Sequence, residues 1–96
     1  MNELYEIEVT EEDILRANRK IVDGLSRVRN CPVSLAIKRA TGSENVSVPS
    51  PRFVGVDDGS YFFTDRYAAQ SLIDWFDGVA WKKPLLPVKL TLVRRD

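Results

Sequence analysis

Residues 31–42 read CPVSLAIKRATG, a stretch that carries complete start and stop signals for a helix. Cys31 or Asn30 is the expected N-cap, and Pro32 suits the first turn, where its missing N–H costs nothing. Gly42 supplies the left-handed residue with which many helices end. The sequence therefore predicts a short helix with well-defined ends.

The apolar residues of this helix share one face. Val33, Ala36, Ile37 and Ala40 recur at three- and four-residue spacing, which is typical of a helix packed on one side. The two alanines are small enough to let the helix lie close against a sheet. We expect this face to form the centre of the core.

Length and composition bound the class of protein. A chain of 96 residues with 44% apolar residues is long enough to bury a core and to form one domain. The single cysteine rules out an internal disulfide framework, which favours a reducing cytoplasm. We find neither an apolar run of membrane-spanning length nor the basic-then-apolar order of a signal peptide, so we expect a cytoplasmic protein that does not enter a membrane.

Alternating apolar and polar residues predict five strands, at residues 4–9, 45–48, 53–57, 61–64 and 88–93. Asp57-Asp58-Gly59-Ser60 has the composition of a tight hairpin turn between the third and fourth of these. Pro49 and Pro51 remove two backbone donors, so the second strand must bend or run along a sheet edge.

A helix should begin after Thr10, which is followed by three acidic residues and can form a capping box with Asp13. From Ile14 onward, the apolar residues of this helix fall on one arc. The arc consists of Ile14, Ile21, Leu25 and Val28, and Leu15 and Val22 flank it. Gly24 weakens the pattern, so the helix ends near Asp23 and restarts, or gives way to a loop.

The last helix should be capped by Thr64 or Asp65 and end at Gly78. Its expected buried face consists of Ala69, Leu72, Ile73 and Phe76. Together, these patterns predict a single α+β domain spanning residues 1–96, with an antiparallel sheet of about four to five strands and three helices packed on one face.

Charge is sorted along the chain although the net charge is zero. Residues 1–15 hold six acids and no base, whereas residues 16–39 hold seven bases and one acid. The bases of this second block form a candidate anion-binding surface for nucleic acid or a signalling nucleotide; they are Arg16, Arg19, Lys20, Arg27, Arg29, Lys38 and Arg39. The alternative interpretation is a solvated helix face, since no recognised nucleic-acid motif accompanies them.

Catalytic chemistry has little support in this sequence. Histidine is absent, which removes the commonest general base and zinc ligand. Cys31 at a helix N-terminus is the one candidate nucleophile, because aligned N–H groups favour a thiolate, but free cysteines are more often buried structural residues. We predict no catalytic residues.

Carboxylates and glycines give no metal or phosphate site. Asp57 and Asp58 are turn formers, Asp65 is a cap candidate, and Asp74 and Asp77 fall on the polar face of the last helix. Their spacing matches no calcium loop, and the glycines match no phosphate-binding loop. We therefore expect neither a metal nor a cofactor.

Two tryptophans are candidate protein-interface residues. Trp75 lies off the expected buried arc of the last helix, and Trp81 follows in a segment that contains prolines. Exposed tryptophans are often interface anchors, whereas the alternative for both is the edge of the core.

Several short motifs occur in a fixed order: VTEEDI at residues 9–14, CPVSLA at 31–36, VSV at 46–48, IDWFDG at 73–78, and a last strand after Pro87. In this order the chain resembles a group of small uncharacterised bacteriophage and prophage proteins. The resemblance implies a host-directed role in the host cytoplasm, such as blocking a bacterial defence or signalling protein.

The expected function is therefore that of a non-catalytic binding protein that acts through protein contacts, with a host protein as partner. Homodimerisation through the tryptophans or an open sheet edge belongs to the same hypothesis. The alternative is a binder of nucleic acid or a signalling nucleotide.

Overall fold

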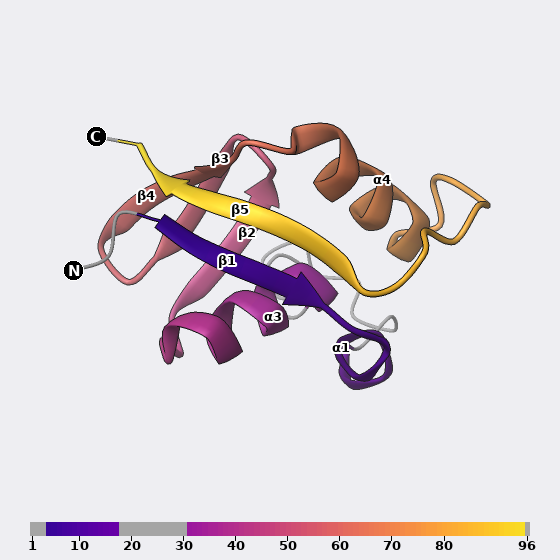
Figure 1. Ribbon diagram of the computed structural model, residues 1–96, viewed down its shortest axis with the longest axis horizontal. Helices are drawn as coiled ribbons and strands as arrows, with labels where there is room; N and C mark the ends of the chain where they lie inside the picture. The colour runs from indigo at the N-terminus through magenta and orange to yellow at the C-terminus, as the bar shows by residue number, and fades with distance from the viewer. Residues whose placement is uncertain (1–3, 18–30, 96) are drawn as a thin grey trace.

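The computed structural model describes residues 4–17 and 31–95 of the chain, whose helices and strands Figure 1 shows. The elements are β1 (Leu4–Val9), α1 (Glu11–Arg16), α3 (Pro32–Thr41), β2 (Val46–Ser50), β3 (Phe53–Val56), β4 (Gly59–Phe63), α4 (Arg66–Phe76) and β5 (Val88–Arg94). The α+β class and the expected strands are confirmed.

The five strands form one sheet in the order β1-β5-β4-β3-β2, and every neighbouring pair is antiparallel. The two strands β1 and β5 run side by side across the front of Figure 1. Pro49 lies in β2, an edge strand whose register with β3 shifts between Ser47 and Ser50. The proline is tolerated there because an edge strand does not need every backbone donor, as the sequence predicted.

The hairpin between β3 and β4 turns over two residues, since Val56 pairs with Gly59. Asp57 adopts the left-handed conformation, with φ at 53°, which two-residue hairpin turns require. The Asp57 carboxylate also accepts a 2.6 Å hydrogen bond from the Ser43 hydroxyl. This bond ties the hairpin turn to the connection between α3 and β2.

Helix α3 has the predicted ends. The Cys31 sulfur accepts a hydrogen bond from the Ser34 N–H, and Gly42 ends the helix with φ at 75°. Ala36 is buried as expected, but Ala40, one turn later, is exposed. The expectation that Ala40 belongs to the core face is therefore wrong, because the last turn of α3 is no longer covered by the rest of the protein.

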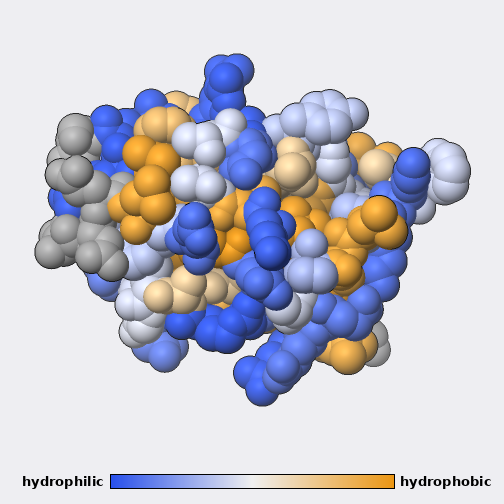
Figure 2. All heavy atoms as spheres, in the orientation of Figure 1, coloured by the Kyte–Doolittle hydropathy of each residue, from blue (hydrophilic) through white to orange (hydrophobic). Residues whose placement is uncertain are grey.

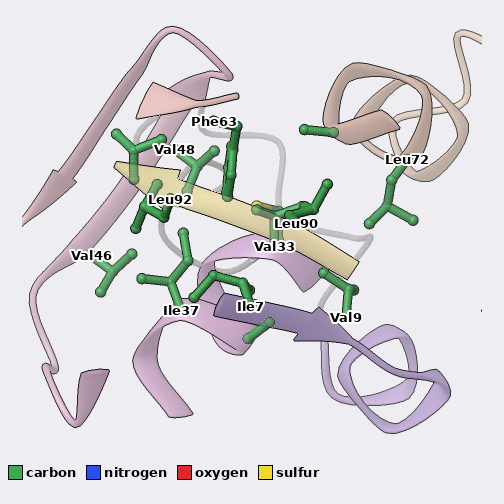
Figure 3. Close-up of a cluster of buried hydrophobic side chains, with 14 of the residues drawn as sticks. Ile7, Val9, Val33, Ile37, Val46, Val48, Phe63, Leu72, Leu90 and Leu92 are labelled. Atoms are coloured by element: carbon green, nitrogen blue, oxygen red, sulfur yellow. The ribbon is translucent and has the colours of Figure 1, made fainter. Parts of the chain in front are cut away.

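The core lies between α3, α4 and the inner face of the sheet (Figure 3). Helix α3 contacts both β1 and β2, which are the opposite edges of the sheet. The sheet must therefore curl around this helix, as strongly twisted antiparallel sheets do. Side chains from all five strands and from α1, α3 and α4 meet there; the largest fully buried ones include Ile7, Ile37, Phe63, Leu72, Leu90 and Leu92.

Helix α1 is much shorter than the sequence predicted. It begins with the expected capping box between Thr10 and Asp13 but ends at Arg16, because Ala17 has an extended backbone (φ −70°, ψ 142°). Ala17 packs against the core instead, and Leu15 is 78% exposed. The expected continuation of the apolar arc falls on residues 18–30, which lie outside the described residues.

Helix α4 buries Ala69, Leu72 and Phe76 as expected, and Gly78 follows it with φ at 81°. Asp65 stands at its N-cap but makes no capping hydrogen bond with its side chain. Its carboxylate accepts instead from the Thr91 N–H of β5 at 3.0 Å. The expected side-chain cap is thus replaced by a bond that ties the start of α4 to the sheet.

Within residues 4–17 and 31–95, we find no helix with the length and apolar character needed to cross a bilayer.

Candidate functional site

The segment between α4 and β5 exposes large apolar side chains to solvent. Val79 is 77% exposed, Trp81 is 92% exposed and Leu85 is 93% exposed. In Figure 1 this segment projects beyond the end of α4, and Figure 2 shows apolar residues at the surface of the same end of the molecule. We call residues 79–85 the apolar loop.

The apolar loop is anchored where it leaves α4. The N–H groups of Val79 and Ala80 both donate to the Asp74 carbonyl oxygen, at 2.8 and 3.1 Å. These bonds close the end of the helix and direct the chain outward. The exposure of Trp81 therefore follows from a defined backbone path.

A groove of about 860 Å³ lies between the apolar loop and the outer face of α4. Its α4 side consists of Tyr67, Gln70, Ser71 and Asp74, and its loop side of Ala80, Lys82, Lys83, Pro84 and Leu85. Tyr67 is itself 87% exposed. We call this hollow the α4–loop groove.

Lys83 links the apolar loop to the rest of the protein. Its Nζ lies 3.0 Å from both carboxylate oxygens of Glu11 in α1 and 5.5 Å from the centre of the Trp75 ring. Within the described residues, Lys82 has no such ion pair. The rim of the groove therefore carries a positive charge that no carboxylate of the described residues pairs with.

The two tryptophans differ in their surroundings. Trp75 is partly buried, packs against the core and lies beneath Lys83. Trp81 stands almost fully in solvent. Of the two predicted interface residues, Trp81 is the one that the fold leaves open to a partner.

Of the seven basic residues predicted to bind anions, the structure describes three: Arg16, Lys38 and Arg39. Arg16 pairs with Glu12 one turn earlier, at 2.9 Å, and both side chains are largely exposed. Lys38 is partly buried in α3. The remaining members before Cys31, namely Arg19, Lys20, Arg27 and Arg29, lie outside the described residues.

Arg39 is half exposed and is held in a bidentate ion pair with the buried Asp13. Its Nη1 and Nη2 donate to the two Asp13 carboxylate oxygens at 2.5 and 3.0 Å, and Nη2 also donates to the Glu8 carbonyl oxygen. The hydrogen bond to Asp13 raises the pKa of Arg39. This guanidinium joins α3 to α1 and to the end of β1. Two of its nitrogens are therefore already bonded within the protein.

Cys31 is buried, with a relative exposure of 5%. Burial raises the pKa of its thiol, and the hydrogen bonds from Ser34 only partly oppose this. Desolvation therefore outweighs the effect of the aligned N–H groups and disfavours the thiolate form that the sequence had made a candidate.

Three of the aspartates considered as metal ligands make structural hydrogen bonds within the fold. Asp57 binds Ser43, Asp65 binds the Thr91 N–H, and the Asp74 carboxylate accepts from the Gln70 amide at 2.8 Å. Among the described residues we find no group of three potential metal ligands.

Sequence reasoning missed most of the α4–loop groove. Val79, Leu85 and Tyr67 were not singled out, because no helical or strand periodicity includes the first two. A signal was present: residues 79–87 combine four large apolar side chains with two prolines and two adjacent lysines. A segment interrupted by prolines is expected to form a surface loop, so that its apolar side chains remain exposed.

Comparisons with protein-family models, with curated proteins and with solved structures gave no match.

Proposed function

We propose that this protein is a non-catalytic binding protein that recognises another protein through the apolar loop and the α4–loop groove. The observation that carries the proposal is the exposure of Val79, Trp81 and Leu85 within seven residues of chain. Several large apolar side chains exposed in one short segment indicate an interaction site, whereas single exposed apolar residues are ordinary. Tryptophan is also the residue type most enriched among interface hot spots.

The lining of the groove indicates the chemistry of the partner. Tyr67, Ala80, Pro84 and Leu85 offer apolar contact, while Lys82 adds a positive charge at the rim. An amphipathic segment with apolar anchors and an acidic flank complements such a groove. We therefore propose a partner segment of that kind, with Trp81 packing against its side.

The resemblance to phage proteins supports a bacterial host protein as this partner, met in the host cytoplasm. A second copy of the chain is the competing occupant. An obligate homodimer would bury Trp81 and Leu85 in every molecule, so light scattering separates the two occupants before any partner is identified.

The test is affinity capture from bacterial lysate with the wild type and with a Trp81→Ala, Leu85→Ala variant. Loss of two anchors should weaken capture of a specific partner by about 30-fold or more, since hot-spot truncations cost about 2 kcal/mol or more. The matched control is Leu15→Ala, because Leu15 is an exposed leucine of α1 that does not line the groove. This control should capture the same partner as the wild type.

Equal capture by the wild type and the double variant would contradict the proposal. If light scattering gives a dimer for the wild type and a monomer for the double variant, the occupant of the groove is a second copy of the chain and not a host protein.

A further inference from the structure

The outer face of the sheet, opposite the core, carries a stack of two aromatic rings and an arginine. Phe53 of β3 is 57% exposed, and Phe62 of β4 is partly exposed between two buried neighbours. The guanidinium carbon of Arg95 lies 4.7 Å from the centre of the Phe53 ring and 5.4 Å from that of Phe62. The same guanidinium donates to the Arg52 carbonyl oxygen, so this planar group is held against both rings.

Two hollows meet beside this stack. The first, of about 430 Å³, is lined by Phe62, Phe63, Thr64, Arg66 and Arg95. The second, of about 630 Å³, is lined by Ser50, Arg52, Thr64, Arg66 and Tyr67 among others. Because Thr64 and Arg66 line both, the hollows are neighbours, and we call the two together the trough, which extends from the end of β5 to the first turns of α4.

Three arginines line this trough, namely Arg52, Arg66 and Arg95. Within residues 4–17 and 31–95, no carboxylate forms an ion pair with Arg52, Arg66 or Arg95. The acidic residues of the outer face, Glu6 and Glu8, lie on β1, which β5 separates from β4. On that side of the sheet face, Lys89 of β5 lies beside Glu8, so the charges are mixed there, whereas the side towards β3 is a basic, aromatic half.

We propose that this basic, aromatic half binds single-stranded nucleic acid. Guanidinium groups bind phosphates, and flat ring and guanidinium surfaces stack on unpaired bases. A duplex would meet only the charges, because its bases are already stacked on one another. An acidic peptide would likewise use the charges and leave the exposed Phe53 ring without a matching contact.

This proposal is independent of the protein-binding function. The trough meets the α4–loop groove at Tyr67 and Gln70, but Arg52, Arg66 and Arg95 do not line that groove. Variants can therefore remove one activity and leave the other intact.

The experiment measures fluorescence anisotropy of labelled oligonucleotides of about 12 residues, a length within the usual range of single-strand sites. The probes are oligo(dT), oligo(U) and a duplex of equal length. If three phosphates are neutralised, the logarithm of the affinity should fall with the logarithm of salt concentration with a slope of about −2, a loss of about 18-fold between about 50 and 200 mM. The two single strands show whether a ribose 2′-hydroxyl is also recognised.

Two substitutions separate stacking from charge. Phe53→Ala should weaken single-strand binding at least about fivefold and leave the salt slope unchanged. Arg66→Gln should weaken binding and make the slope less steep by about 0.7, the share of one phosphate contact. Arg16→Gln and Trp81→Ala are matched controls, an exposed arginine and an exposed aromatic residue elsewhere, and both should bind as the wild type does.

Several results would overturn the proposal. The first is that neither single strand binds at about 50 mM salt. The second is that wild type and Phe53→Ala bind a single strand with equal affinity. The third is that polyglutamate or the duplex binds as tightly as the single strands, or more tightly. A loss caused by Arg16→Gln but not by Arg66→Gln would assign nucleic-acid binding to the basic residues of 16–39 instead.

Discussion

The bidentate pair between Asp13 and Arg39 should be a main support of the fold, and Arg39→Met tests it. Asp13 has a side-chain exposure of 2%, whereas that of Arg39 is 50%. Methionine keeps much of the unbranched stem and nearly the same helix propensity, so the substitution removes mainly the charge and its donors. What remains is a buried carboxylate with bonds only from the N–H and hydroxyl of Thr10.

The expected loss in the free energy of unfolding is about 2 kcal/mol. Removing one partner of a fully buried pair costs about 3–5 kcal/mol, and removing one partner of an exposed pair about 0–1 kcal/mol. The pair lies between these limits, because Arg39 is half in water and Thr10 still bonds the carboxylate. A domain of this size has a total stability of about 5–14 kcal/mol, so the loss should lower Tm by about 8–16 °C.

Urea unfolding followed by tryptophan fluorescence measures this change. The matched control is Arg16→Met, which breaks the exposed pair with Glu12 and should cost no more than about 0.5 kcal/mol. A double-mutant cycle with Asp13→Asn should give a coupling energy of about 1–2 kcal/mol. If Arg39→Met is as stable as Arg16→Met, the ion pair with Asp13 does not hold α1 to α3.

Two further predictions concern α3. Ala36→Trp should lower the free energy of unfolding by at least about 3 kcal/mol, because the buried Ala36 leaves no room for an indole. Ala40→Trp, at an exposed position of the same helix, should lower it by less than about 1 kcal/mol. Similar Tm values for the two variants would contradict the packing of α3 on the sheet. Cys31 should react with iodoacetamide at least about 100-fold more slowly in native protein than in urea, because the thiol is buried and its pKa is raised. Mass spectrometry measures the alkylation rate in both conditions. Equal rates in native protein and in urea would show that the N-terminus of α3 is open to solvent.

Short-range signals explain what could be predicted from the sequence. The ends of α3, the capping box at Thr10, the hairpin turn at Asp57 and the edge position of Pro49 each depend on a few neighbouring residues. The physical causes are local: a missing N–H, a left-handed backbone, or a side chain that bonds its own turn. The alternation of apolar and polar residues predicted the five strands, since a period of two indicates which face of a strand is buried.

Contacts between distant residues decided the rest. Helix propensity would carry α1 past Ala17, yet Ala17 leaves the helix and packs on the core. Arg39 was expected on a solvated or anion-binding surface, but the buried carboxylate of Asp13, 26 residues away in the chain, binds its guanidinium.

Both candidate surfaces also arise only in the folded chain. The exposure of Trp81 depends on where α4 ends, and the three guanidiniums of the trough come from a turn, a helix start and the end of β5. Spacing along the chain cannot show such neighbours, because the sheet order, and not sequence distance, sets which strand ends meet. The sequence by itself thus determined the strands and the ends of α3, whereas tertiary packing determined where α1 ends and which side chains the surface presents together.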